Sequence, residues 1–196
     1  MSKKQKQPLE IPTLEALEAE LARLKYKNRF RQTLLGTIYV LITVAAVAIL
    51  VSMLWLPVLR ISGTSMSPTL EDGELVVSVK DSGFERGDMI AFYYNNKILI
   101  KRVVALAGEW VNIDPDGNVY INDVLYDEPY LTEKALGQCD LEFPYQVPDG
   151  RIFVLGDHRS VSVDSRSKMV GCVAQEQVVG RLLMRIWPLE EVVVYE

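Results

Sequence analysis

The feature that most constrains this chain is an uncharged run of 23 residues from Leu34 to Leu56, which reads LLGTIYVLITVAAVAILVSMLWL. As a helix it would measure about 35 Å at about 1.5 Å per residue, enough to cross the hydrocarbon core of a bilayer. A buried helix of a soluble protein rarely runs this long without a charge. A cleaved signal peptide would have a shorter apolar region, about 7–15 residues, behind a short basic head. We therefore predict an uncleaved, single-pass membrane anchor over residues 34–56.

The charges on the two sides of this run predict its orientation. Five basic residues lie within residues 23–31, whereas only Arg60 follows the run before Lys80. Because basic residues favour the cytoplasmic side, residues 1–33 are expected in the cytoplasm and residues 57–196 outside it. The inner segment carries eight Lys and Arg against four Asp and Glu, and the outer one thirteen against twenty-two. The basic inner segment suits anionic lipid, and the acidic outer segment argues against a nucleic-acid partner.

The cytoplasmic segment, residues 1–33, is expected to contain a short amphipathic helix from Thr13 onward. Its leucines recur at spacings of three and four and form one apolar stripe. The stripe lasts only about two heptads, whereas a coiled coil is indicated by at least three. Two interpretations stay open: pairing with another helix, or a helix that is solvated or lies on lipid. The stripe consists of Leu14, Leu17, Leu21 and Leu24.

The outer segment, residues 57–196, has the pattern of an all-β domain. Short stretches such as ELVVSVK, MIAFYY, ILIKRVVAL, WVNI and RIFVLGD alternate with clusters of Gly, Asp, Asn and Pro. Val, Ile, Tyr and Phe between such turn signals are typical of strands. We predict a mainly β fold of antiparallel strands, arranged as a barrel or a sandwich. The more polar segment Glu128–Pro148 is expected to be a loop or a small insertion.

The chain offers few residues for the commoner kinds of catalysis. It has one histidine, His158, and two cysteines far apart, which do not make a zinc ligand set. It has no Gly-rich phosphate loop, and we expect neither a metal nor another cofactor. The segment SGTSMSPTL, just outside the anchor, contains Ser65. If Ser65 is a nucleophile, its base is either His158 or a lysine that is held neutral.

Lys101, within ILIKRVVAL, is the candidate lysine. In a strand, Lys101 shares a face with Leu99 and Val103, so its amine is placed among apolar side chains. Burial lowers a lysine pKa from about 10.4 by up to about 3–5 units, which brings it close to the range where a general base works best. The alternative is a lysine that extends to solvent from a strand edge.

Four segments resemble, in order and spacing, the sequence boxes of bacterial type I signal peptidases, also called leader peptidases. They read SGTSMSPTL, RGDMIAF, ILIKRVVALAGE and LGDHRSVSVDSR, and together they cover nearly the whole outer domain. The resemblance implies a membrane-bound serine endopeptidase with a Ser-Lys dyad, which removes signal peptides from exported pre-proteins at the outer face of the membrane. It also implies a mostly antiparallel β catalytic core, shared with the self-cleaving repressors of the SOS response.

The resemblance implies a role for each matched residue. Ser65 matches the nucleophile and Lys101 the general base. Ser162 matches the serine that orients the lysine, and Asp164 and Arg166 match a structural ion pair beneath the site. Extended chain would place the last three on one face, since they are two residues apart. The alternative for Asp164 and Arg166 is surface charge, which contributes little to stability.

The resemblance also places a substrate pocket. Leu59, Ile61 and Ile100 match positions lining small apolar pockets, which accept Ala at the first and third residues before the cut. Gly63 would let the substrate backbone approach closely. Gly63 stands where some members have a serine that donates to the oxyanion, so the second donor is unassigned, with Thr64 or another backbone group as candidates. His158 stands where the family usually has Asn.

Two other functions remain open from the sequence. One is a self-processing Ser-Lys protease, or one of another specificity, built on the same core. The other is a catalytically inactive, membrane-anchored interaction module. The presence of both Ser65 and Lys101 favours a protease.

The two cysteines, Cys139 and Cys172, both lie in the predicted outer domain, where a disulfide is chemically feasible. They bracket the segment that contains Ser162, Asp164 and Arg166. A bridge would close a loop of about 33 residues and contribute roughly 3.5 kcal/mol by the chain-entropy model. We predict that they pair, and the alternative is two separate thiols.

Overall fold

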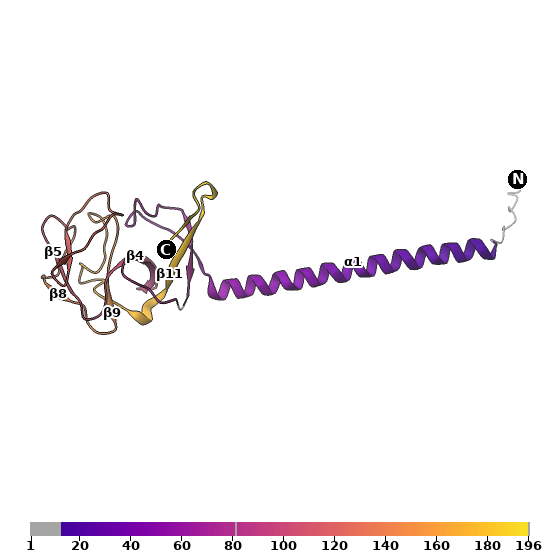
Figure 1. Cartoon of the computed structure of the whole chain (residues 1–196), viewed down its shortest axis with the longest axis horizontal. Coiled ribbons are helices and arrows are strands. Elements are labelled where there is room, and N and C mark those ends of the chain that lie inside the picture. Colours follow the sequence, from indigo (N-terminus) through magenta and orange to yellow (C-terminus); the bar gives the residue numbers. More distant parts are fainter. Residues whose placement is uncertain (1–12, 81, 196) are drawn as a thin grey trace, which may run out of the picture. The chain divides into compact units, whose positions relative to one another are not determined.

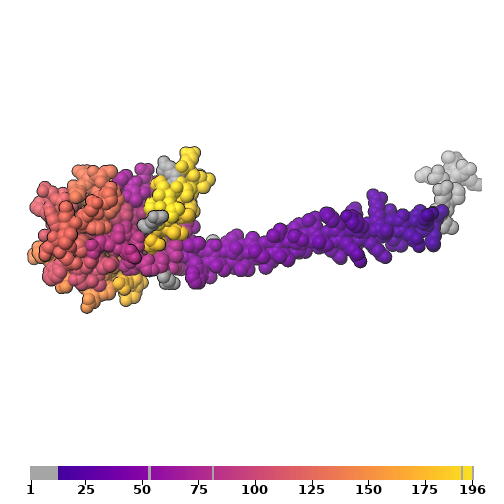
Figure 2. All heavy atoms as spheres, viewed as in Figure 1, coloured from indigo at the N-terminus to yellow at the C-terminus, as the bar shows by residue number. Residues whose placement is uncertain are grey.

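The structure is a computed structural model that describes residues 13–80 and 82–195. Its contacts divide the chain into two units, with the boundary between Val51 and Ser52. The first unit consists of most of one helix, α1 (Leu14–Trp55), and the second contains the strands (Figure 1). The space-filling view shows the strand-containing unit as a body of closely packed side chains (Figure 2).

Helix α1 combines the two helical segments that the sequence predicts. It starts one residue after Thr13 and continues through the position predicted as the start of the anchor. Among the described residues it is the one helix long and apolar enough to cross a membrane, and its most apolar 18-residue window has a mean hydropathy of 2.7. Inside it, the hydroxyls of Thr37 and Thr43 donate to carbonyls one turn earlier. Both hydroxyls therefore have hydrogen-bond acceptors within the helix, which polar groups in lipid require.

The second unit is built from two antiparallel sheets, which confirms the mainly β prediction. The larger sheet has eight strands in the order β1-β2-β11-β3-β4-β9-β10, with β12 paired to β11, and the smaller has the order β7-β6-β5-β8. The strands of the larger sheet are β1 (Val58–Arg60), β2 (Leu75–Val79), β3 (Met89–Tyr94), β4 (Lys97–Ala105), β9 (Arg151–Leu155), β10 (Val173–Ala174), β11 (Val178–Trp187) and β12 (Val193–Val194). Those of the smaller are β5 (Trp110–Ile113), β6 (Val119–Ile121), β7 (Val124–Leu125) and β8 (Tyr145–Gln146), and two short 3-10 helices are η1 (Gln175–Gln177) and η2 (Leu189–Glu191).

Two tight turns explain the pairing of consecutive strands, and one of them is next to the site. β3 and β4 are joined by Asn95 and Asn96, whose φ angles of 42° and 64° lie in the left-handed region. Asn tolerates this region, and such turns match the natural twist of a hairpin. Asn122 and Asp123, at φ 51° and 66°, join β6 to β7 in the same way. The β3–β4 turn fixes the register that pairs Ile90 with Lys101.

Side chains of the larger sheet pack on both of its faces. In β4, Val104 belongs to a core shared with the smaller sheet, whereas Val103 belongs to a core formed mainly with β3 and β9. A third core lies under the loop between β1 and β2, and we call it the Ser65-loop core. It consists of Ile61, Met66, Leu70, Val76, Met89, Ala91 and Leu182.

The segment Glu128–Pro148 is largely irregular, as predicted, except that it contributes the short strand β8 to the smaller sheet. Some of its side chains are also buried, which is not expected of an insertion on the surface. Glu128 is 4% exposed and Val147 is 1% exposed. The segment therefore forms part of the domain's interior and contacts the residues behind the site.

Candidate active site

Ser65 and Lys101 meet in the structure. Ser65 lies in the loop between β1 and β2, Lys101 lies in β4, and Lys101 Nζ is 2.6 Å from Ser65 Oγ. Lys101 is 3% exposed, so the interpretation of a lysine that reaches solvent is wrong for this position. Burial lowers the pKa of its amine from 10.5 to about 8, against the opposing effect of the Asp164 and Asp157 carboxylates. An amine with this pKa is neutral in a useful fraction of molecules at moderately alkaline pH.

The loop that carries Ser65 is held by backbone and side-chain hydrogen bonds on both sides of the serine. The N–H of Ile61 donates to the carbonyl of Glu74 at 2.8 Å, and the N–H of Gly63 donates to Asp72 Oδ1 at 2.8 Å. Gly63 has φ 93°, a conformation that side-chain-bearing residues rarely adopt, and no atom lies within 4 Å of where its Cβ would be. The open space beside Gly63 leaves room for another backbone.

His158 contacts the backbone around Ser65 and not the Ser65 hydroxyl. The backbone N–H of His158 donates to the carbonyl of Ser65 at 3.1 Å, and its ring Nδ1 lies 3.2 Å from the carbonyl oxygen of Thr64. The hydroxyl of Ser65 instead faces Lys101. Of the two bases that the sequence left open, the lysine is the one within hydrogen-bonding distance.

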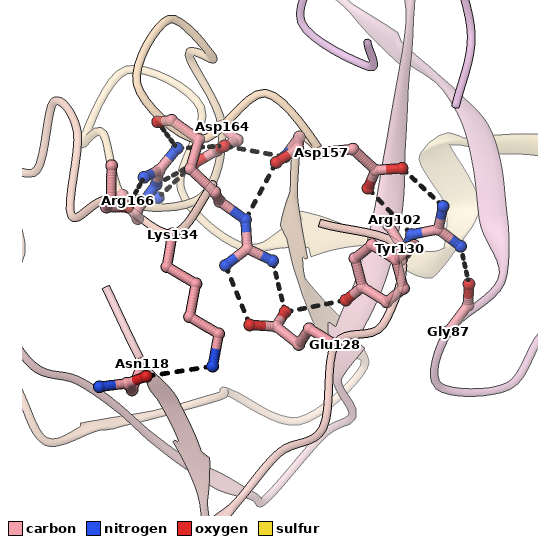
Figure 3. A network of polar contacts seen from close by, with 12 residues as sticks. Gly87, Arg102, Asn118, Glu128, Tyr130, Lys134, Asp157, Asp164 and Arg166 are labelled. Carbon is pink, nitrogen blue, oxygen red and sulfur yellow. Dashed lines mark hydrogen bonds and ion pairs between the residues drawn. The ribbon is translucent and has the colours of Figure 1, made fainter. Parts of the chain in front are cut away.

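Asp164 and Arg166 form a buried ion pair beneath the site, not a surface contact. Arg166 Nε and Nη2 donate to the two oxygens of Asp164, both at 2.8 Å, and both residues are at most 1% exposed. Arg166 also donates to the carbonyls of Leu136 and Arg159, while Asp164 Oδ2 accepts the N–H of Gly156 (Figure 3). A bidentate pair with these extra partners fixes the path of the surrounding chain.

Ser162 lies next to Ser65, but it makes no hydrogen bond to Lys101. Both serines pack against Gly156: a Cβ added there would lie 2.2 Å from Ser162 Oγ and 2.5 Å from the carbonyl oxygen of Ser65. Ser162 Oγ is buried and has no hydrogen-bond partner among the described residues. A buried hydroxyl without a hydrogen-bond partner destabilises the folded state, so its retention calls for an explanation. The predicted role of Ser162, a hydrogen bond that orients Lys101, would supply that partner.

Sequence reasoning missed the polar network that holds Ser65 and Lys101 from behind. Arg102 donates to both oxygens of Asp157, at 2.9 and 2.6 Å, and to the carbonyl of Gly87 at 2.7 Å. Asp157 Oδ2 also accepts the hydroxyl of Thr69 at 2.5 Å. The network therefore joins β4, which carries Lys101, to the loop that carries Ser65. The available signal was that Arg102 directly follows Lys101 and so projects to the opposite face of β4.

A second buried ion pair extends this network into the segment after β7. Arg159 and Glu128 are hydrogen-bonded ion-pair partners, and both are at most 4% exposed. Tyr130 donates its hydroxyl to Glu128 at 2.8 Å, and the guanidinium carbon of Arg102 lies 3.9 Å from the centre of the Tyr130 ring. Figure 3 shows Tyr130 between Glu128 and Arg102. Charges buried at this depth are tolerated because each has several partners.

Two hollows adjoin the pair formed by Ser65 and Lys101. The first, of about 90 Å³, is lined by Ile61, Gly63 and Ile100, three of the four residues predicted for the substrate pocket. Leu59, the fourth, does not line it and packs against the Ser65-loop core instead. The second hollow, of about 420 Å³, lies on the side of Thr64 and the loop after β9.

The predicted disulfide is wrong in this structure: Cys139 and Cys172 are both free thiols. Cys172 is buried in the core shared by the two sheets, whereas Cys139 Sγ lies 3.7 Å from the carbonyl of Leu141. The two thiols therefore have different surroundings, and neither is the other's partner. The segment that they bracket is instead held by the Asp164–Arg166 pair.

Comparison with known proteins identifies the family. Residues 34–187 match the family model described as signal peptidase, peptidase S26. This chain belongs to the signal peptidase family. The match covers most of the chain, including the apolar run, Ser65, Lys101 and the segment around Arg166.

Curated relatives agree with this assignment. Signal peptidase IB of Staphylococcus aureus (strain COL) is 36% identical over 151 residues, covering 67% of this chain and 78% of the relative. Thylakoidal processing peptidase 1 of Arabidopsis thaliana is 36% identical over 149 residues, which is 67% of this chain but 42% of the relative's length. A crystal structure of signal peptidase I from Enterococcus faecalis V583 has 34% sequence identity and a TM-score of 0.45, covering 52% of this chain and 97% of that one.

The family assignment confirms the resemblance on which the prediction depended. The chain is a serine endopeptidase, a hydrolase, with one apolar N-terminal helix that serves as a membrane anchor. The comparisons do not assign a role to any single residue.

Proposed function

We propose how this member of the signal peptidase family removes signal peptides from pre-proteins: Ser65 is the nucleophile and Lys101 is the general base. The single observation that carries this proposal is the 2.6 Å approach of Lys101 Nζ to Ser65 Oγ, with the lysine buried. A buried amine with a lowered pKa is an effective base for a hydroxyl. The same geometry argues against an inactive interaction module, which would need no such approach.

The reaction has two steps. Neutral Lys101 takes the proton of the Ser65 hydroxyl while Oγ attacks the carbonyl carbon of the scissile bond. The protonated lysine then gives its proton to the leaving nitrogen, the C–N bond breaks, and an ester of Ser65 remains. Neutral Lys101 next takes a proton from water, which attacks the ester, and Oγ recovers its proton as the signal peptide leaves.

The backbone of Ser65 supports the developing oxyanion. Its N–H has no acceptor in the described part of the chain, while its carbonyl is fixed by the N–H of His158. A donor held in this way is preorganised, and losing one such donor typically costs about 10²–10³ in rate. The second donor is Thr64 or another backbone group, because Gly63 has no side chain and its N–H already donates to Asp72.

The first hollow supports specificity for a small residue before the cut. Its volume of about 90 Å³ between Ile61 and Ile100 holds only a few water molecules. A methyl group fits such a space easily, and we expect bulkier side chains to be accepted less well. The family resemblance assigns Ala to the first and third positions before the cut, and the hollow's size is consistent with that assignment.

In the proposed topology, the N-terminus lies in the cytoplasm and the peptidase domain lies on the outer face of the membrane. Basic residues before α1's apolar part support this orientation. Ser65 follows Leu56 by nine residues, so at about 3.3 Å per residue it lies within roughly 30 Å of the end of the apolar run. Lys80 and Ser78 also donate their N–H groups to the carbonyls of Trp55 and Pro57. A signal peptide that spans the membrane would emerge at this level.

Cleavage of a purified pre-protein by the full chain in detergent tests the proposal. Wild-type protein is expected to release a signal peptide after a small residue, as mapped by mass spectrometry. Ser65→Ala should reduce the rate by at least 10³, while its melting temperature stays within about 2 °C of wild type because only one hydroxyl is lost. Residual activity within tenfold of wild type would exclude Ser65 as the nucleophile.

A further inference from the structure

The first third of α1 carries an apolar stripe that the proposed function does not use. We call its residues, Leu14, Leu17, Leu21 and Leu24, the leucine stripe. All four are exposed, the last three at 49–50% and the first at 79%. We propose that the leucine stripe pairs with the same stripe of a second copy of this chain, as a parallel coiled coil. The inference goes beyond the proposed function, because it concerns how copies of the chain assemble.

The continuity of α1 argues against the alternative, in which the stripe lies on lipid. α1 is one helix from Leu14 to Trp55, so the stripe and the apolar run share an axis (Figure 1). Leu24 precedes the start of the run, Leu34, by ten residues, which is about 15 Å at about 1.5 Å per residue. A helix that crosses a bilayer and continues straight carries the stripe away from lipid. Lying on the surface would require a sharp bend, and α1 has neither a proline nor an interruption.

The same continuity extends the repeat beyond the stripe itself. In the heptad notation of coiled coils, Leu14 and Leu21 are at position a, and Leu17 and Leu24 are at position d. The count continues into the apolar run, with these residues at a or d: Leu35, Ile38, Ile42, Ala45 and Ile49. Transmembrane helices commonly pack at the crossing angle of coiled coils, so the pairing surface can continue into the bilayer. It then exceeds the three heptads that the stripe alone does not reach.

Two polar residues interrupt the repeat between the stripe and the apolar run. Asn28 falls at position a and Arg31 at position d. A single Asn at a is compatible with a coiled coil, where it fixes the register and the number of helices at a cost in stability. Arg31 lies three residues before the run, and its long side chain can extend from the helix pair to the lipid headgroups. The pairing is therefore weaker than that of an uninterrupted repeat.

Charges beside the stripe favour a second copy of the same helix as the partner. Two copies inserted in the same direction pair in parallel, and position g of one then faces position e, five residues later, of the other. Glu20, at g, faces Lys25 of the second copy, at e, and symmetry gives this contact twice. The flanking g and e positions each pair one charged with one uncharged residue, so no like charges meet. Within one helix, Glu20 lies 3.8 Å from Arg23, and both side chains are at least 60% exposed, so that contact is weak.

Disulfide cross-linking of the full chain in membranes tests which face pairs. The two native thiols are first removed by Cys139→Ser and Cys172→Ala, since both are free and lie outside α1. Leu21→Cys should then give a cross-linked dimer on mild oxidation, because side chains at a meet across a parallel pair. Ala19→Cys, at position f on the opposite face, is the matched control and should give several-fold less dimer at the same amount of chain per lipid.

Exchanging charges tests whether the partner is a second copy. In the Leu21→Cys chain, Glu20→Lys should lower the yield of dimer several-fold, because it places like charges against each other twice. Adding Lys25→Glu should restore the yield. The double variant keeps the new lysine beside the thiol, so its recovery isolates the contact between helices. Glu15→Lys makes the same change of charge at position b, away from the stripe, and should leave the yield unchanged.

Three results would overturn the inference. The first is an equal yield from Leu21→Cys and Ala19→Cys, and the second is no recovery in the double variant. The third is a Leu21→Cys thiol that forms no dimer and is protected from a water-soluble maleimide, which would assign the stripe to lipid. None of these variants changes Ser65 or Lys101, so each result leaves the proposed function intact.

Discussion

At the scale of single residues, the site depends on an amine that the fold keeps from water. Lys101 loses hydration on burial, and the nearby Asp157 and Asp164 carboxylates compensate only in part, since its pKa still falls to about 8. The folded chain therefore pays a free-energy cost to protonate Lys101 that the unfolded chain does not. If Lys101 is the base, as we propose, catalysis and stability are linked, because the desolvation that lowers its pKa also destabilises its charged form.

Replacing Lys101 should make the protein inactive and more stable. The amine titrates near pH 8 when folded and near 10.5 when unfolded, so below pH 8 both states are protonated and the folded state bears the full cost. Lys101→Met should raise the free energy of unfolding at pH 7 by up to about 3 kcal/mol, at about 1.36 kcal/mol per pKa unit. The gain should shrink between pH 8 and pH 10.5 and disappear above it. Calorimetry at pH 7 and pH 10.5 measures this, and a variant less stable than wild type at pH 7 would contradict it.

His158→Asn should have a mild effect, within several-fold of wild-type activity. The contact that His158 makes with the nucleophile uses its backbone N–H, which any residue except proline supplies. Steady-state kinetics on one peptide substrate measures the effect. A loss of 10³ or more would mean that the imidazole takes part in proton transfer.

At the scale of elements, the strands bring together residues that are far apart in the sequence. The hairpin of β3 and β4 sets the register of Lys101, and the loop between β1 and β2 carries Ser65. The segment from Gly156 to Arg166, which follows β9, lies beneath both. Its shape depends on two buried ion pairs, Asp164–Arg166 and Glu128–Arg159.

Removing one partner of the Glu128–Arg159 pair should be strongly destabilising. Glu128→Ala leaves the guanidinium of Arg159 buried, with Gly156 O as its remaining partner, and we expect a loss of about 3–5 kcal/mol. The double variant Glu128→Leu, Arg159→Met should recover much of this loss, because no charge is then left buried. Denaturant unfolding in detergent measures both.

The control for this prediction is Arg181→Gln. Arg181 and Asp88 form a partly exposed pair at 3.5 Å, and such pairs contribute about 0–1 kcal/mol. If Glu128→Ala costs no more than Arg181→Gln, the buried pair does not stabilise this segment.

Sequence reasoning brought Ser65 and Lys101 together, as the structure does, but it did not find the residues that support them. Ser65 and Lys101 follow from a hydroxyl-rich loop and an apolar strand, and the family resemblance ties them together. Arg102, Asp157, Glu128 and Tyr130 could not be assigned because their partners are distant in the sequence and depend on tertiary packing. The strands were predicted from β-branched runs between turn residues, whereas β8 lies in a polar segment with no such pattern. The cysteines were misjudged because spacing along the chain does not give the distance between two thiols.

At the scale of the whole molecule, the proposed function requires attachment to a bilayer, with the peptidase domain on the side where signal peptides emerge. α1 supplies an apolar segment long enough to cross a membrane, and β1 begins three residues after it ends. In the proposed function, the substrate has its own apolar segment in the membrane, so an anchored enzyme would meet the cleavage site in the same plane.

The charge distribution predicts a fixed orientation. Protease added outside intact cells whose outer surface is accessible should digest residues 57–196 and leave the N-terminal segment protected. Replacing the five basic residues at positions 23–31 by serine should weaken this preference, because the positive side is normally retained in the cytoplasm. Protection of the peptidase domain in wild-type cells would contradict the orientation.

The pH dependence of cleavage tests the central claim, that Lys101 is the base, most directly. For the full chain in detergent with one peptide substrate, kcat/KM should rise with pH through a midpoint near 8, where the buried amine loses its proton. His158→Asn should leave that midpoint unchanged. The account would be contradicted by a rise with a midpoint of about 6.5, the ordinary pKa of a histidine, if that rise disappears in His158→Asn.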